Sequence, residues 1–193
     1  MSEQLTQREI DLWTDLLKKY KTLYVAELER TRAQADFDAA KQVFLSADIH
    51  RVELFRQTLR DFQFGNEARI HSLELIKLLN IEDAKQLLPE LVFLASWGHG
   101  ALKKAQDLIL DLPRDWVIAH IEEASRPVLA KAEVEDEEAK AEDKSADYGY
   151  LAEAYGYLLD LYSLLDRELA RRLAKEAVSH PDKRVKAVGE EFL

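Results

Sequence analysis

The chain has 193 residues, no cysteine and a formal net charge of −10, and 47% of its residues are hydrophobic and 33% charged. This length can bury a hydrophobic core, and the composition is that of a folded protein rather than a disordered one. The missing cysteines exclude disulfides, thiolate zinc sites and cysteine nucleophiles, and the acidic charge argues against nucleic-acid binding, because phosphate contacts need a basic surface.

The first 47 residues predict a long helix. Glycine and proline are absent before residue 65, and apolar residues recur at steps of three, four and seven. Thr6 and Glu9 form a capping box at the start. We expect a helix over about 6–46, roughly 60 Å long, which packs on the rest of the chain because Lys19 and Arg30 interrupt its apolar stripe. The stripe comprises Leu12, Leu16, Leu23, Ala26, Ala33, Phe37, Ala40 and Phe44.

The remainder, residues 48–193, contains an internal repeat. At an offset of 33 residues, "FGNEARIHSLELIKLL" (64–79) aligns with "WGHGALKKAQDLILDL" (97–112), and weaker copies occur near "YGYLAEAYGYLLDLY" and "HPDKRVKAVGEEFL". Each copy follows another helical segment, and no segment alternates as a strand does. The chain is therefore predicted to be all-α. We expect a right-handed α-solenoid of about four antiparallel hairpins, whose first helices cover about 49–63, 83–96, 114–130 and 166–179.

These segments resemble the HEAT-repeat family. "LLPELVFLASWGHGALKKAQDLILDL" (87–112) is similar to the HEAT pattern of an apolar first helix with a proline, here Pro89, a turn and a second helix. The resemblance implies a scaffold or adaptor that binds a partner along a curved surface. The Asp and Arg ladder of regular HEAT arrays is mostly missing, so a tetratricopeptide-like array or an irregular helical bundle remains an alternative.

An acidic segment, residues 131–147, lengthens the third repeat. It carries eight acidic and three basic residues. We expect a solvated, disordered insertion, with an extension of the preceding helix as the alternative.

Two groups of residues are candidates for partner binding. Tyr148, Tyr155 and Tyr162 are spaced by seven and share one helix face, and tyrosine is a favoured anchor in interfaces; core packing is the alternative. Arg171, Lys175 and Lys186 belong to a basic C-terminal hairpin that could dock an acidic partner, or could form an ordinary solvated face.

The histidines do not predict a catalytic or metal site. His99 lies between two glycines, but its equivalent in the first copy is Asn66, so we expect a helix–helix turn there rather than chemistry. Three His-x-x-Glu pairs, which begin at His50, His71 and His120, are expected to be surface pairs, because di-metal bundles use the opposite order. We predict no cofactor and no metal.

The favoured function is a non-enzymatic scaffold or adaptor that binds another protein. One alternative is a helical-repeat enzyme or chaperone for a bulky aromatic ligand, such as a bilin or a nucleobase. Another is a structural homo-oligomer joined through the N-terminal helix. Because the N-terminus is polar and the longest uncharged stretch, "LVFLASWGHGAL", is too short to span a bilayer, we expect a soluble, cytoplasmic protein without membrane contact.

Overall fold

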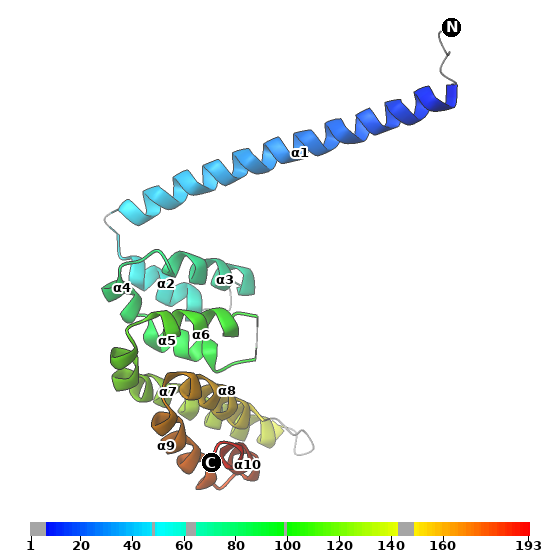
Figure 1. Cartoon of the computed structure of the whole chain (residues 1–193). Helices are drawn as coiled ribbons and strands as arrows, with labels where there is room; N and C mark the ends of the chain where they lie inside the picture. Colours follow the sequence, from blue (N-terminus) through cyan, green and yellow to red (C-terminus); the bar gives the residue numbers. More distant parts are fainter. Residues whose placement is uncertain (1–6, 48, 61–64, 99, 143–148) are drawn as a thin grey trace. The chain divides into compact units, whose positions relative to one another are not determined.

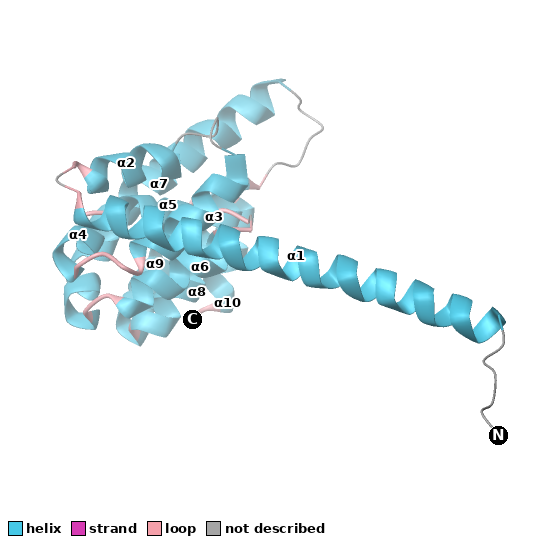
Figure 2. Ribbon diagram, turned by 90° about the horizontal axis from the view of Figure 1, so that it is seen from above, coloured by secondary structure: helices cyan, strands magenta, loops and turns pink. Residues whose placement is uncertain are grey.

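The computed structural model describes residues 7–47, 49–60, 65–98, 100–142 and 149–193. Ten helices and no strand occur in these ranges (Figures 1 and 2), which confirms the all-α prediction. The chain divides into two compact units, residues Met1–Ile49 and His50–Leu193.

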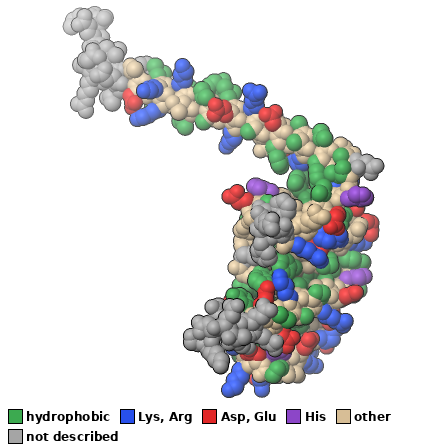
Figure 3. Space-filling view, turned by 180° about the vertical axis from the view of Figure 1, so that it is seen from behind, with side chains coloured by type: hydrophobic (Ala, Val, Ile, Leu, Met, Phe, Trp, Pro, Cys, Tyr) green, Lys and Arg blue, Asp and Glu red, His purple; other side chains and the backbone are tan. Residues whose placement is uncertain are grey.

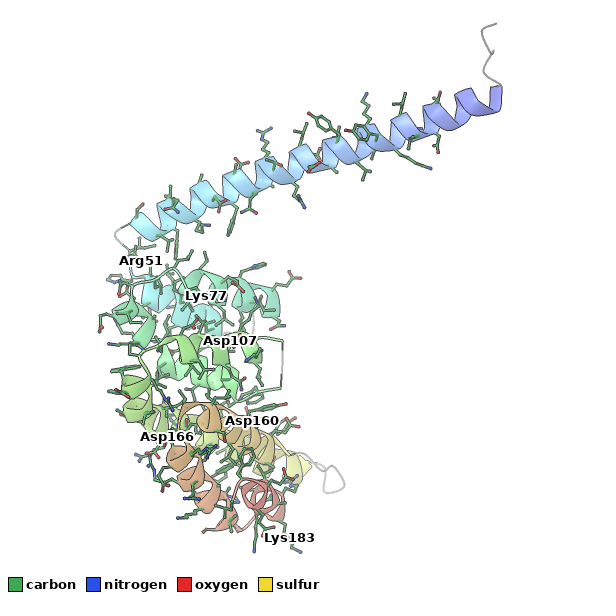
Figure 4. All side chains as sticks on the ribbon, viewed as in Figure 1. Arg51, Lys77, Asp107, Asp160, Asp166 and Lys183 are labelled. Atoms are coloured by element: carbon green, nitrogen blue, oxygen red, sulfur yellow. The ribbon has the colours of Figure 1, made fainter. Side chains whose placement is uncertain are left out.

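The first unit contains one helix, α1 (Gln7–Ser46), close to the predicted range. Its charged side chains pair along the helix: the Lys19 Nζ lies 2.7 Å from Asp15, and the Lys41 Nζ lies 2.5 Å from Asp38. Most apolar side chains between residues 14 and 43 are exposed, up to 70% for Leu23, whereas Phe44 and Leu45 are half-buried. Figures 3 and 4 show these side chains projecting from the helix surface.

The second unit is built from pairs of helices. In each pair the two helices pack against each other, and the four pairs correspond to the four predicted hairpins. A short helix, α4 (Ile81–Lys85), connects the first pair to the second. The pairs are α2 (Arg51–Arg60) with α3 (Gly65–Ile76), α5 (Leu88–Ala95) with α6 (Leu102–Asp111), α7 (Arg114–Glu142) with α8 (Tyr150–Leu165), and α9 (Arg167–Val178) with α10 (Lys183–Glu191).

Each pair also contacts the next pair along the chain. The second helices of the first two pairs, α3 and α6, pack together, as do the first helices α2 and α5; α5 then packs on α7 and α8. The last junction differs, since α8 packs on both α9 and α10. Fully buried side chains occur in all four pairs, so apolar burial continues from pair to pair. Examples are Leu59, Leu94, Leu158 and Val185.

Local capping fixes where several helices begin. The side chains of Asn80, Asp166 and Asp182 accept hydrogen bonds from backbone N–H groups in the first turns of α4, α9 and α10. Figure 4 shows Asp166 at the junction of α8 and α9, where this one residue both ends a helix and caps the next. Gly65, at the start of α3, has a φ of 73°, a left-handed conformation that favours glycine.

The predicted helix over 83–96 is interrupted. α4 ends at Lys85 and α5 begins at Leu88. Pro89 lacks a backbone N–H and cannot donate to the carbonyl of Lys85, so a continuous helix would leave that carbonyl without its usual partner. Pro89 therefore lies in the first turn of α5, where proline is tolerated, and not in the interior of a longer helix.

The acidic segment is helical over most of its length, which corrects the expectation of a disordered insertion. α7 continues to Glu142, and residues 143–147 lie outside the described part of the chain. Ala132 and Asp136 are only 1% and 2% exposed. The Asp136 Oδ2 lies 2.9 Å from the Arg184 Nη2 of α10, and this pairing anchors an acidic helix to the C-terminal hairpin.

Candidate functional site

Two of the three tyrosines in the predicted stripe, Tyr155 and Tyr162, belong to the core and not to the surface. Tyr155 and Tyr162 are 4% and 1% exposed, because α8 packs against α5, α7, α9 and α10. Tyr148 lies outside the described residues. The expected exposed stripe is therefore absent at the two residues that can be described, although partner binding by the protein itself stays untested.

Both buried hydroxyls have polar partners. The Tyr162 Oη donates a 2.8 Å hydrogen bond to the Ser125 Oγ, and the Tyr155 Oη lies 3.4 Å from Glu176. Burial raises the pKa of Tyr162 to about 12, since the phenolate would lose its hydration. Burial also raises the pKa of Tyr155, and the negative charge of Glu176 adds to the effect.

The three predicted basic residues are exposed. Arg171 and Lys175 lie on α9, and Lys186 lies on α10. The Arg171 guanidinium lies 3.5 Å from Glu168 on the same helix. The neighbouring Arg172 pairs with Glu122 of α7 at 2.9 Å, so acidic groups offset part of the basic charge on this face.

The segment around His99 connects two helices, as predicted, because α5 ends at Ala95 and α6 begins at Leu102. His99 itself lies outside the described residues. His50, His71 and His120 are exposed. Within the ranges that the structure describes, no group of three or more His, Asp or Glu side chains is arranged to hold a metal ion.

A groove between α5 and α7 is the strongest candidate for a binding surface. It has a cavity volume of about 320 Å³, and residues of α2, α5 and α7 line it. Apolar side chains dominate the lining, and one cation comes from α2 and another from α7. We call it the α5–α7 groove; its lining residues are Arg60, Pro89, Phe93, Ala124, Pro127, Val128 and Lys131.

A buried carboxylate holds the Arg60 side of this groove. Glu90, next to Pro89 in α5, is 1% exposed. Its Oε1 lies 2.6 Å from the Arg60 Nη2 and 3.3 Å from the Arg56 Nε. A buried carboxylate needs such compensation because it has lost its hydration. The ion pairs therefore fix the direction of Arg60, whose side chain is still 61% exposed.

The Lys131 side of the groove is aromatic. The Lys131 Nζ lies 5.0 Å from the ring centroid of Phe93 and 5.7 Å from that of Trp97, within the range of cation–π attraction. The rings of Phe93 and Trp97 are 5.8 Å apart, and Trp97 stacks on Tyr150 at 6.1 Å. Phe93, Trp97 and Tyr150 thus form a continuous aromatic row that begins in the groove.

The row is partly accessible to solvent. Tyr150 is 37% exposed, and Phe93 and Trp97 are half-buried. Rigid aromatic rings beside an apolar groove provide contact area at low cost in conformational entropy, which is typical of protein-binding surfaces. The groove and the adjoining aromatic row thus combine apolar side chains, stacked rings and two cations.

Sequence reasoning missed this site, although part of its signal is visible. Pro127 and Lys131 are four residues apart and share one face of α7. Phe93 and Trp97 have the same spacing, although Trp97 lies just past the end of α5. The sequence alone does not show that these two pairs of residues meet. Tyr150 belongs to the tyrosine-rich segment, but to the face next to the one that was predicted to bind.

A second cavity, of about 280 Å³, lies where α7, α8 and α9 meet, and its lining includes Tyr162, Glu122 and Arg172. Its functional groups are already engaged: Tyr162 bonds to Ser125, and Arg172 pairs with Glu122. The volume is slightly below the range of about 300–1,000 Å³ that is usual for ligand pockets. This cavity does not favour the bulky-ligand alternative.

No family model matches the sequence, and neither a curated protein nor a solved structure matches it. Among the helices that the structure describes, none combines the length and apolar character needed to cross a bilayer.

Proposed function

We propose that residues 48–193 form a HEAT-like α-solenoid that serves as a non-enzymatic protein-binding module. The contacts between helix pairs support the architecture, because each pair packs on its neighbours in sequence and the core continues through shared faces. Such nearest-neighbour packing is typical of repeat proteins, in which one hairpin alone cannot bury its apolar side.

The aromatic row beside the α5–α7 groove is the observation that carries the binding proposal. A short, mainly apolar segment of another protein would lie in the groove and stack against Phe93 and Trp97. Lys131, whose Nζ lies near both rings, would be close enough to pair with a carboxylate of the partner. The lining offers no catalytic group beyond ion-paired charges, so binding is its best-supported use.

Photo-crosslinking tests the proposal directly. A photoreactive amino acid replaces Pro127, which is exposed at the groove. In a second protein it replaces Lys175, an exposed residue of the C-terminal basic face. We expect a defined partner protein to be crosslinked in the native cell from position 127 and not from position 175. Crosslinking of the same protein only from position 175 would move the binding surface to α9.

Matched substitutions then measure the energetic contribution of the groove. Lys131→Glu and Phe93→Ala should weaken binding of the crosslinked partner about 30-fold or more, since anchor residues contribute about 2 kcal/mol or more. Lys175→Glu makes the same charge reversal on α9 and should leave affinity within about threefold. Unchanged affinity in both groove variants, with their helical circular dichroism intact, would refute the proposed site.

A further inference from the structure

An exposed apolar stripe runs along α1 in the first unit. Leu16, Leu23 and Phe37 are 56%, 70% and 53% exposed. Ala26, Ala33 and Ala40 lie on the same stripe and are also exposed. Soluble proteins rarely leave an apolar stripe of this length uncovered. In heptad terms the three large residues occupy a positions and the three alanines occupy d positions.

We propose that α1 pairs with α1 of a second copy of this chain in an antiparallel two-helix coiled coil. The two-fold axis crosses the pair at the level of Leu28 along the helix. In this register Leu16 faces Ala40 of the second copy, and Leu23 faces Ala33. A large residue thus meets a small one in these two layers, which lie on either side of a layer formed by Lys19 and Phe37, so the helices can approach closely there.

The two cations that interrupt the stripe select the orientation. In the antiparallel register Arg30 faces Ala26 of the second copy, a position near Glu27 and Glu29. Lys19 faces Phe37 of the second copy, which lies between Asp36 and Asp38. Each interrupting cation therefore meets a position near two carboxylates.

A parallel, in-register pair has the opposite charge pattern. It would place Lys19 against Lys19 and Arg30 against Arg30 within the seam. Like charges that face each other across a coiled coil oppose pairing. The present partners of Lys19 and Asp38 lie on the same helix, and the side chains of Lys19 and Asp38 are themselves 71% and 47% exposed, so these groups remain accessible to a second copy.

The arrangement would give the protein two copies of its second unit. Each follows the C-terminal end of α1, so antiparallel pairing separates the two Ser46 residues by roughly 54 Å at 1.5 Å per residue. A dimer of this kind would present two α5–α7 grooves at once. The proposed dimer does not depend on the function proposed for the groove, and it is tested without a partner protein.

Light scattering of the full chain is the first test. We expect a dimer at about 100 µM, at least a tenfold weaker dimer for Leu23→Glu, and an unchanged dimer for Val25→Glu. Val25 is the matched control because it lies on the same turn, is 44% exposed and points away from the seam. A monomeric wild type, or equal effects of the two substitutions, would overturn the proposal, as would a monomer that instead binds anionic lipid vesicles through the same residues.

Orientation is tested with spin labels. Because the chain has no cysteine, Ser46→Cys introduces a single labelling site. Antiparallel pairing predicts a label separation of roughly 50–60 Å, whereas parallel pairing predicts roughly 10–20 Å at interaxial distances of 8–10 Å. Arg30→Glu should weaken the dimer, and adding Glu27→Arg should restore part of the affinity. A short label distance, or no recovery in the double variant, would reject the register.

Discussion

The hydroxyl of Tyr162 donates a 2.8 Å hydrogen bond to the Ser125 Oγ, which joins the last turn of α8 to α7 inside the core. Ser125 in turn donates to the carbonyl of Ile121, one turn earlier on α7, at 2.8 Å. Both side chains are at most 2% exposed. This short chain of polar groups therefore sets the register of α8 on α7 with no water needed to complete it.

Tyr162→Phe should lower the free energy of unfolding by about 1 kcal/mol, because one buried hydrogen bond is lost while the ring keeps its packing. Urea unfolding followed by circular dichroism measures the change. Tyr157→Phe on the same helix is the control, since Tyr157 is only half-buried, and it should change stability less. Equal effects of the two substitutions would show that the bond to Ser125 contributes little.

Alkaline pH should destabilise the wild type in a defined range. The pKa of Tyr162 is about 12 in the folded chain and 10.0 for the ordinary side chain. The unfolded chain therefore releases the proton first. The stabilisation is complete below pH 10 and is lost as pH rises to about 12, by up to about 3 kcal/mol. Urea unfolding at pH 9 and pH 11 should show a smaller loss in Tyr162→Phe than in the wild type. Identical pH profiles would contradict this assignment.

The internal repeat contains more information about the core of α8 than the tyrosine spacing does. When Ala154 is aligned with Ala105, Leu158 takes the place of Ile109 and Leu161 that of Leu112, and all of these residues are buried. The repeat alignment thus marks the core leucines of α8, whereas the seven-residue spacing of the tyrosines fits a core and an interface equally well. Helix pairing was predictable for the same reason: apolar periodicity reports which face is buried.

The α5–α7 groove could not be predicted in the same way. Its lining depends on how far apart α5 and α7 lie, and on the half-exposed rings of Phe93 and Trp97 beside Lys131. The spacing of apolar residues predicts which face of a helix is buried. It does not predict where two packed helices leave a space between them. A helical extension was only the alternative for the acidic segment, because composition alone does not reveal that the buried Asp136 has Arg184 as its partner.

The ion pairs of the buried Glu90 with Arg56 and Arg60 give a prediction about stability. Arg56→Ala with Arg60→Ala should destabilise the fold by about 2 kcal/mol or more, because Glu90 would remain buried without a cation. Glu90→Met should cost less, since an apolar side chain of similar length removes the buried charge. Urea unfolding ranks the two proteins. If Glu90→Met were the more damaging change, the ion pairs themselves would be a net source of stability.

Asp136 gives a prediction about local dynamics. Asp136→Ala removes the carboxylate that pairs with Arg184 and should release the C-terminal part of α7 from α10. Backbone amides after residue 132 should then exchange at least tenfold faster, while amides near Ile121 should change little. Hydrogen exchange followed by mass spectrometry resolves the two regions. Glu138→Ala is the control, as it removes a charge from the same segment; equal acceleration in both variants would mean that net charge, and not the Arg184 pairing, governs the end of α7.

Gly189 and Gly156 form a matched pair for testing how closely α10 packs on α9. A Cβ at Gly189 would lie 2.7 Å from the backbone oxygen of Ala174 and 2.8 Å from the Cβ of Ala177, closer than real atoms approach. Both neighbours belong to the buried face of α9, so the helices must separate, and Gly189→Ala should cost about 1–3 kcal/mol despite the better helix propensity of alanine.

A Cβ at Gly156, within α8, would meet only the Cγ1 of Val188 at 3.9 Å, an ordinary contact. Gly156→Ala should therefore stabilise the chain by up to about 1 kcal/mol, because alanine loses less conformational freedom in a helix. Thermal unfolding should move in opposite directions for the two substitutions. If both substitutions raised the thermal unfolding midpoint, α9 and α10 would be able to move apart at little cost in stability. If both lowered it, the higher helix propensity of alanine would not determine the effect at position 156.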